Sequence, residues 1–419
     1  MNTQDLTAIK QQCEQTRKAA KAIALANPTQ KNAILFSMVK ALIENKATIL
    51  AANERDVEQA EKDGLSAAMI DRLTINLTGI EQMQKALAEV AELPDPLSEV
   101  LPMTKRPNGI KVRKKRIPLG VILMIYESRP NVTVEAAALA LKSGNGIILR
   151  GGKEAFHSNQ AIATCWQKAL TDNGFHPAGI TVLASTDRQL MNELLKLDEL
   201  IDVVIPRGGE GLIRHVVANS HIPVIKHYKG VCHLYVDESA DLPLALDLLI
   251  NGKTQRPGVC NALEGLIVHQ HIASAFLPEA ASALQAKGVK LYGCSKTRQL
   301  LPEIEAADGD LFAKEFLALE ISIVTVDSFD EAVEFIDQYG SGHTEVIATQ
   351  SQDNAERFIN EVDASVVMVN ASSRFSDGGE LGLGAEIGIS TSKIHAYGPM
   401  GLESLTSQKF VVEGEGQIR

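Results

Sequence analysis

The chain has 419 residues, of which 45% are hydrophobic and 22% are charged, as is typical of a folded globular protein. At about 150 residues per domain, this length predicts two to three domains. The 41 Lys and Arg residues against 52 Asp and Glu give a formal net charge of −11, which argues against a nucleic acid or an anionic membrane as the partner.

The amino-terminal residues and the cysteines indicate a cytoplasmic protein. The first residues lack a basic stretch followed by an apolar one, so we expect no signal peptide. No uncharged apolar run approaches the roughly 20 residues of a membrane-spanning helix. The cysteines are odd in number and irregularly spaced, which favours reduced thiols over a disulfide framework; they are Cys13, Cys165, Cys232, Cys260 and Cys294.

Residues 3 to about 90 alternate apolar and charged positions with helical period and predict a helical lead-in. Asn108-Gly109, between two extendable runs, then predicts a hairpin. The basic run Lys111–Arg116 could form a nucleic-acid patch. Because it alternates within a strand of an acidic protein, a solvated or subunit-facing strand is the favoured interpretation.

From Val121 onward, strands and helices alternate in two series, which predicts parallel sheets with helical crossovers. We therefore expect two α/β domains with a cleft between them. In the first series the expected strands are 121–125, 147–150, 181–184, 202–205 and 223–225, and the expected helices are 133–143, 153–172, 187–197 and 211–219. In the second series the expected strands are 233–236, 263–269, 289–292, 321–326, 345–349 and 366–369, with helices from 242 and 272 and over 329–339 and 354–362.

Cys260 lies in a polar loop rich in proline and glycine, Thr254–Asn261, just before an expected strand. A thiol reacts as its thiolate, which needs exposure and local positive potential. The loop therefore favours a nucleophile over a packed cysteine. A half-buried cysteine without a chemical role is the alternative at this point, because no histidine adjoins it in the sequence.

Two glycine turns between a strand and a helix are candidate nucleotide sites. They are Arg150-Gly151-Gly152-Lys153 and Arg207-Gly208-Gly209-Glu210-Gly211. Glycines let the backbone approach a phosphate, and the helix amino terminus offers N–H donors. Either turn alone is more typical of an ordinary connection between a strand and a helix. Two such turns with flanking cations favour a binding site for a dinucleotide. Arg150 and Lys153 favour a ribose 2′-phosphate and hence NADP.

Other polar residues have two possible interpretations. Asn131 lies where a loop enters a helix, so its amide can cap that helix or donate to an oxyanion formed at Cys260. His227, Cys232 and His233 match no common zinc spacing, so we expect no metal and a structural or substrate-facing role.

Together these features resemble the aldehyde dehydrogenase superfamily, and within it the reductases that act on γ-glutamyl phosphate. The likeness covers the whole chain and rests on seven runs in order: Tyr126–Thr133, Leu149–Glu154, Ile205–Gly209, His227–His233, Gln255–Asn261, Ser341–Glu345 and Asn370–Phe375.

The resemblance implies a fold and a set of roles. It implies an NADP-binding domain over 1–105 and 121–228, an oligomerisation arm over 106–120 and 400–419, and a catalytic domain over 229–399. Cys260 is then the nucleophile and Asn131 the oxyanion amide. The expected cofactor contacts are Arg150 and Lys153 at the adenosine ribose, Gly208 and Gly209 at the pyrophosphate, and Glu320 at the nicotinamide ribose.

The reaction implied is the reduction of L-glutamyl 5-phosphate by NADPH to L-glutamate 5-semialdehyde and phosphate, the second step of proline biosynthesis. His227 stands where oxidative relatives have a water-activating glutamate, which is consistent with a reductase. The expected partners are a second copy of the chain and glutamate 5-kinase. The expected substrate contacts are Glu127, Arg129, His343, Ser372 and Arg374.

Two other functions stay open from the sequence. One is oxidation of a semialdehyde to a free acid. The other is nucleotide binding without catalysis.

Overall fold

A computed structural model describes residues 3–419, which form two compact units. The first unit contains the chain up to Lys226, with Leu383–Gly388 and Met400–Arg419, and the second contains His227–Gly382 and Ile389–Pro399. The catalytic domain expected over 229–399 corresponds to most of the second unit, whereas 383–388 belongs to the first. This segment joins the first unit because the Ile387 N–H donates to the Met400 carbonyl at 3.0 Å and Glu386 lies 3.8 Å from Arg207.

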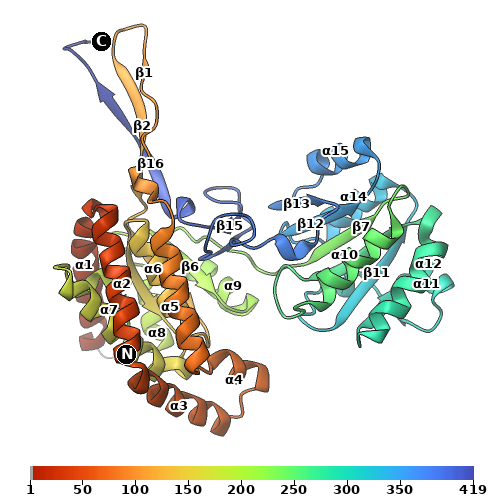
Figure 1. Cartoon of the computed structure of the whole chain (residues 1–419), viewed down its shortest axis with the longest axis horizontal. Helices are drawn as coiled ribbons and strands as arrows, with labels where there is room; N and C mark the ends of the chain where they lie inside the picture. The colour runs from red at the N-terminus through yellow and green to blue at the C-terminus, as the bar shows by residue number, and fades with distance from the viewer. Residues whose placement is uncertain (1–2) are drawn as a thin grey trace. The chain divides into compact units, whose positions relative to one another are not determined.

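Helices form the first part of the chain, as the periodicity predicts (Figure 1). The second of them begins with a capping box, in which the Asn27 side chain accepts from the Gln30 N–H and the Gln30 side chain accepts from the Asn27 N–H. Its apolar side chains, including Leu35 and Met38, are buried. The helices are α1 (Thr3–Leu25), α2 (Pro28–Glu44), α3 (Lys46–Lys62), α4 (Ala67–Leu73) and α5 (Leu77–Glu92), followed by the short η1 (Pro96–Ser98).

The first unit contains a four-stranded parallel sheet in the order β5-β4-β3-β6. The chain moves outward from β3 to β5 and then returns to the other side of β3, so the strand order reverses between β3 and β6. Ligands of such sheets bind where the strand order reverses, at the carboxyl ends of the strands, here those of β3 and β6. The elements are β3 (Val121–Tyr126), α6 (Asn131–Lys142), β4 (Gly146–Arg150), η2 (Lys153–Ala155), α7 (Phe156–Asp172), η3 (Pro177–Gly179), β5 (Ile180–Val182), α8 (Arg188–Leu194), β6 (Val203–Arg207) and α9 (Glu210–Asn219).

The strand expected at 223–225 is wrong. Val224 makes a single bridge with Val204, and no ladder extends from it. The Pro223 carbonyl accepts from the Val204 N–H at 2.9 Å, and the Ile225 N–H donates to the Val204 carbonyl at 3.0 Å. The next bond of a parallel ladder would need the N–H of residue 206, which is Pro206 and has none. The contact therefore remains an isolated bridge.

An antiparallel three-stranded arm projects from the body of the first unit (Figure 1). It contains β1 (Thr104–Lys105), β2 (Lys111–Pro118) and β16 (Thr406–Glu413). The turn between the first two strands includes Gly109, whose φ of 91° suits glycine. The basic run thus forms a strand, as predicted, and pairs along its length with the end of the chain.

The second unit contains a seven-stranded parallel sheet in the order β10-β9-β11-β8-β7-β12-β13. One face packs on α10 and α11 through Leu249 and Leu277, and the other packs on α14 and α15 through Ile336 and Phe358. The strands are β7 (Cys232–Val236), β8 (Leu263–His269), β9 (Lys290–Gly293), β10 (Glu305–Ala306), β11 (Glu320–Val326), β12 (Thr344–Ala348) and β13 (Val366–Val369). The helices are α10 (Leu242–Thr254), α11 (Gln270–Ala286), α12 (Ser295–Leu300), α13 (Gly309–Phe312), α14 (Phe329–Tyr339), α15 (Gln352–Glu361) and η4 (Ser373–Phe375).

Three short elements follow, β14 (Gly388–Ser390), β15 (Gly398–Met400) and η5 (Glu403–Leu405). The two parallel sheets and the β arm confirm the fold class predicted from the sequence. Across residues 3–419, no helix combines the length and apolar character that a bilayer crossing requires.

Candidate active site

Burial separates the five cysteines into two groups. Cys13, Cys165 and Cys232 are buried, whereas Cys260 and Cys294 are partly exposed. Burial raises the pKa of the Cys13 thiol to about 12 and that of Cys165 to about 11, and it also raises the pKa of Cys232. These three thiols stay protonated at neutral pH and are poor nucleophiles.

Of the two exposed thiols, that of Cys294 has a structural task. Its sulfur accepts a hydrogen bond from the Thr297 N–H at 3.4 Å and so caps α12. Cys260 lies in a turn between α10 and β8. Exposure and position therefore both single out Cys260.

Cys260 lies at the amino-terminal edge of the second sheet. It precedes β8, and Glu320 begins β11 while His343 directly precedes β12. These strands and β7 are consecutive in the order β11-β8-β7-β12, and all are parallel, so their first residues share one edge. The structure thus brings Cys260, Glu320 and His343, all predicted site residues, to the same edge.

The backbone of Cys260 is held against the segment that enters β7. A Cβ atom on Gly230 would lie 2.1 Å from the Cys260 carbonyl oxygen and 2.8 Å from its Cβ, so only glycine fits there. The Cys232 thiol donates to the same carbonyl oxygen at 3.2 Å. The Glu315 carboxylate accepts from the Gly230 N–H at 2.9 Å, which fixes the glycine in turn.

A buried ion pair joins the two ends of the Cys260 loop. Lys253, near the end of α10, lies 2.7 Å from Glu264 in β8, and both side chains are fully buried. The Lys253 ammonium also donates to the Leu263 carbonyl at 2.9 Å. Burial raises the pKa of Glu264 to about 7 and lowers that of Lys253, while each partner opposes the shift of the other.

The second oxygen of Glu264 fixes a neighbouring segment. It accepts from the Leu317 N–H at 3.1 Å, and Leu317 has a φ of 53°, which is rare for a leucine. This hydrogen bond helps to hold the unusual conformation. The segment leads directly into β11, whose first residue, Glu320, accepts from the Tyr292 hydroxyl at 2.6 Å.

His343 is fully buried beside the loop. Its Nδ1 lies 2.7 Å from the Thr344 hydroxyl and 3.7 Å from the Cys232 sulfur. Burial, with a contribution from His227, lowers the pKa of His343 to about 3, so the ring is neutral. The Nδ1 of His227 lies 3.2 Å from the Ile389 carbonyl oxygen. His227, Cys232 and His233, which lie close together in the sequence, contact different partners in the structure. His233 pairs with Glu345 at 2.9 Å, and the Cys232 thiol donates to the Cys260 carbonyl.

Ser372 and Arg374 lie at η4, which packs against α10 and β12. Ser372 is buried and donates to the Asn251 side chain at 2.6 Å, and Arg374 is partly buried. Burial lowers the pKa of Arg374, and the nearby charge of Arg256 lowers it further. Arg256 is not among the predicted site residues, although it lies in the same loop as Cys260.

The two glycine turns of the first unit flank β3 at the carboxyl edge of its sheet. Arg150 ends β4 and Arg207 ends β6, and they align with Ile125 and Tyr126 of β3. A Cβ at Gly209 would meet no atom within 4 Å, so the backbone there is open to a ligand. In the structure the Gly209 N–H, at the start of α9, donates to the Glu127 carboxylate at 3.1 Å.

The turn Arg150–Lys153 carries two cations, and one of them has a donor atom without a hydrogen-bond partner among the described residues. Arg150 donates to the Thr186 carbonyl at 2.6 Å, but its buried Nε has no partner among the described residues. Burial lowers the pKa of Arg150, and the positive charge of nearby Arg188 lowers it further. Lys153 is exposed and lies 3.9 Å from Asp63. Arg188 is a further cation that sequence analysis did not select.

Asn131 is the first residue of α6, and its side chain does not cap the helix. Its Nδ2 instead donates to the Glu135 carboxylate at 3.0 Å. Burial raises the pKa of Glu135, whereas Asn131, Arg207 and Arg129 lower it. The alternative that Asn131 is a helix cap is therefore wrong.

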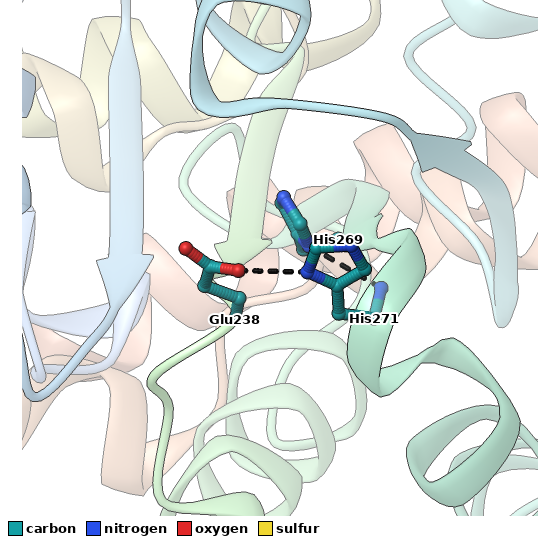
Figure 2. A group of neighbouring side chains, drawn as sticks. All are labelled: Glu238, His269 and His271. Carbon is teal, nitrogen blue, oxygen red and sulfur yellow. Dashed lines mark hydrogen bonds and ion pairs between the residues drawn. The ribbon is translucent and has the colours of Figure 1, made fainter.

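One further cluster lies apart from this region. The ligand atoms of Glu238, His269 and His271 lie within 4.8 Å of one another. Figure 2 shows Glu238, on the loop that follows β7, facing the two histidines around the start of α11. The His271 N–H donates to His269 Nδ1 at 3.3 Å, and His271 Nδ1 lies 2.8 Å from Glu238. His269 ends β8 whereas Cys260 precedes it, so the cluster lies at the opposite edge of the sheet.

Comparison with known proteins agrees with this architecture. The aldehyde dehydrogenase family model matches residues 1–292 and 306–411. A γ-glutamyl phosphate reductase from Xanthomonas campestris pv. campestris is 56% identical, with 98% of this chain and 99% of that protein covered. One from Shewanella denitrificans is 54% identical over the whole of both chains. The crystal structure of γ-glutamyl phosphate reductase from Thermotoga maritima has a TM-score of 0.96 at 45% identity and covers 98% of this chain and 99% of its own.

The chain therefore belongs to the aldehyde dehydrogenase family, and within that family to the γ-glutamyl phosphate reductases. It is an oxidoreductase of that group.

Proposed function

We propose that this protein reduces L-glutamyl 5-phosphate to L-glutamate 5-semialdehyde and phosphate with NADPH, as a step in the cytoplasmic synthesis of proline. The substrate follows from the name shared by relatives that match the chain from end to end. The observation that carries the chemistry is the partial exposure of Cys260 in a turn, while three other thiols are buried and protonated. This is the position of a cysteine that reacts.

In this proposal the Cys260 thiolate attacks the γ-carbonyl carbon of the substrate. A C–S bond forms, and the C–O bond to the phosphoryl group breaks as phosphate leaves with the electron pair. Asn131 and the Cys260 N–H donate to the oxygen that carries the negative charge of the tetrahedral intermediate. Covalent catalysis divides the reaction into two easier steps, and loss of one oxyanion donor costs on the order of 10²–10³ in turnover.

NADPH, when bound, would supply the hydride that reduces the thioester carbon. The C–S bond then breaks, the electron pair returns to the Cys260 sulfur, and the semialdehyde is released. The residues proposed to hold it are Arg150 and Lys153 at the adenosine ribose, Gly208 and Gly209 at the pyrophosphate, and Glu320 at the nicotinamide ribose. The unpartnered Nε of Arg150 and the open space at Gly209 fit an anionic ligand. The cation at residue 150 supports NADP over NAD, since an acidic residue there would favour a free ribose hydroxyl.

Substrate contacts are proposed for Glu127, Arg129, His343, Ser372 and Arg374. Full burial of His343 and the bond from Ser372 to Asn251 favour a supporting role for these two. Oxidative relatives have a carboxylate base where this chain has His227. We propose that His227 does not activate water to attack the thioester.

The arm is proposed to join copies of the chain into an oligomer. Phe410 and Val412 on β16 are 69% and 57% exposed, which is unusual for large apolar side chains on a strand. A glutamate 5-kinase, which would supply the unstable acyl phosphate, is proposed as a further partner.

The test is the reverse reaction, oxidation of L-glutamate 5-semialdehyde by NADP⁺ in the presence of phosphate. The wild-type protein should reduce NADP⁺ only when phosphate is present, and Cys260→Ser should have no activity. NADPH formation without phosphate would indicate oxidation to the free acid instead. A fully active Cys260→Ser variant would remove the nucleophile from the proposal.

A further inference from the structure

The η4 segment lies along the Cys260 loop and is fixed to it at three points. Ser372 donates to the Asn251 side chain at 2.6 Å, and the Arg374 Nε donates to the Gln255 side chain at 2.7 Å. The Asn261 amide donates to the Ser376 carbonyl at 2.8 Å. Because these bonds span the loop from before Gln255 to after Cys260, the Arg374 side chain is held beside the nucleophile loop.

This arrangement places Arg374 in contact with Gln255, whose neighbour in the chain is Arg256. Within residues 3–419, neither guanidinium has a carboxylate within ion-pair distance. The positive charge of Arg256 works against the charge of Arg374, whereas Asp377 and Cys260 stabilise it. Arg374 is partly buried, whereas Arg256 is exposed.

Some arginines of the chain do form close ion pairs. Arg116 contacts Glu99 and Glu403, each at 2.7 Å. Arg357 contacts Asp330 and Glu361, also at 2.7 Å. Among the described residues no carboxylate lies within ion-pair distance of Arg256 or Arg374, and Asp377 attracts Arg374 only from farther away. Two guanidinium groups on neighbouring segments, neither of them in a close ion pair, can together bind an anion.

We propose that Arg256 and Arg374 form the subsite that binds the phosphoryl group of the acyl phosphate, and inorganic phosphate in the reverse reaction. This inference rests on the proposed function and adds the location of its leaving group. As the C–O bond breaks, negative charge develops on the departing phosphate, and the two guanidinium groups stabilise it with charge-assisted hydrogen bonds. In reverse, they hold phosphate where its oxygen attacks the Cys260 thioester.

The substrate also carries an α-carboxylate, an anion that arginine recognises in the same way. The two sources can be separated in the reverse reaction, because phosphate and the semialdehyde are then different molecules. Phosphate carries only the phosphoryl group, and the semialdehyde carries only the carboxylate. Their Michaelis constants therefore report on the two anions independently.

The experiment compares Arg256→Gln, Arg374→Gln and Arg374→Lys with the wild type in phosphate-dependent oxidation of the semialdehyde. The KM for phosphate should rise about 10- to 100-fold in the Gln variants, as expected for lost charge-assisted hydrogen bonds. Arg374→Lys should lose less, because it keeps the charge and loses the bidentate geometry. Arg357→Gln, the control, removes an exposed arginine of the same unit and should leave both constants unchanged.

A second readout does not depend on turnover. Inorganic phosphate should slow the alkylation of Cys260 by iodoacetamide in the wild type and in Arg357→Gln, but not in Arg256→Gln or Arg374→Gln.

The possible outcomes distinguish the hypotheses. A rise in the KM for the semialdehyde, with the KM for phosphate unchanged, would overturn the inference and assign the pair to the α-carboxylate. Unchanged constants and undiminished protection by phosphate in all variants would also overturn it. A wild-type protein without phosphate-dependent activity would instead contradict the proposed function, a result visible before any variant is made.

Discussion

The Cys232 thiol donates a hydrogen bond to the backbone carbonyl of Cys260 at 3.2 Å, so one cysteine positions another. The donor must be protonated, and burial ensures this by raising the pKa of Cys232. The two sulfur atoms therefore have different tasks although they lie in adjacent segments. The buried thiol supports the loop, and the partly exposed one is the proposed nucleophile.

The five thiols should differ in reactivity as they differ in burial. Iodoacetamide at neutral pH should modify Cys260 first, Cys294 more slowly, and Cys13, Cys165 and Cys232 only on unfolding. Peptide mass spectrometry at increasing reaction times measures this order, with protein in urea as the control for full labelling. Rapid modification of any buried thiol in the folded protein would contradict it.

The contact between Gly230 and Cys260 should be essential to activity. In Gly230→Ala the new Cβ would lie 2.1 Å from the Cys260 carbonyl oxygen, so the loop must shift. A displacement of about 1 Å can reduce activity about 100-fold, and we expect a loss of that size in kcat/KM. Gly258→Ala is the matched control, because its Cβ would have no neighbour nearer than the Leu317 carbonyl at 3.8 Å. Equal activities of the two variants would contradict the role of this contact.

Removing one partner of the buried pair between Lys253 and Glu264 should destabilise the second unit. Lys253→Met leaves an unpaired buried carboxyl group and should lower the free energy of unfolding by about 3–5 kcal/mol. The double variant with Glu264→Leu should recover part of this loss, because it leaves no unpaired charge. Urea denaturation measures both. Lys393→Met, which removes a pair with exposed Asp363, should change stability by less than about 1 kcal/mol.

His343 should make the fold sensitive to acid. Its pKa is lowered to about 3 in the folded protein and is about 6.5 in the unfolded chain, so below pH 6.5 the unfolded chain binds the additional proton. The stability contributed by the neutral ring is therefore complete above pH 6.5 and is lost as the pH falls towards 3. The slope reaches about 1.4 kcal/mol per pH unit.

Urea denaturation between pH 7 and pH 4 measures this slope. His343→Asn should weaken the dependence, whereas His395→Gln, a change at an exposed histidine of the same unit, should keep it. An unchanged slope in His343→Asn would show that another group is responsible.

The exposed apolar side chains of the arm should support self-association. Phe410→Asp places a charge on the exposed face of β16 and should shift the oligomer towards smaller species at micromolar concentrations. Sedimentation velocity measures the change. Lys409→Asp, which alters the adjacent exposed position, is the control for charge alone. A single species of unchanged size in Phe410→Asp would exclude this face from the interface.

The sequence predicts the strand and helix series well because buried parallel strands such as Val121–Tyr126 read as continuous apolar runs. It predicts Cys260 from the composition of its loop. It does not show that Lys253 and Glu264 meet, because that contact depends on how α10 packs on β8. A signal was present, since Glu264 is a charged residue within an otherwise apolar strand.

Other features depend on contacts between distant residues and could not be read from local patterns. The assignment of 383–388 to the first unit depends on contacts with Arg207 and Met400. Arg207 lies far earlier in the chain, and Met400 lies after the segment. Arg256 became a candidate only when η4 placed Arg374 beside it. A lone arginine in a polar loop gives no sign of its neighbour.

The pairing of β2 with β16 also sets an order of events during synthesis on the ribosome. Arg116 and Thr406, which contact each other in the arm, are separated by 290 positions in the chain. At about 5–20 residues per second, the partner strand emerges roughly 15–60 s after β2. Throughout that interval the lysines and arginines of β2 remain as a charged open edge, which discourages pairing with other nascent chains.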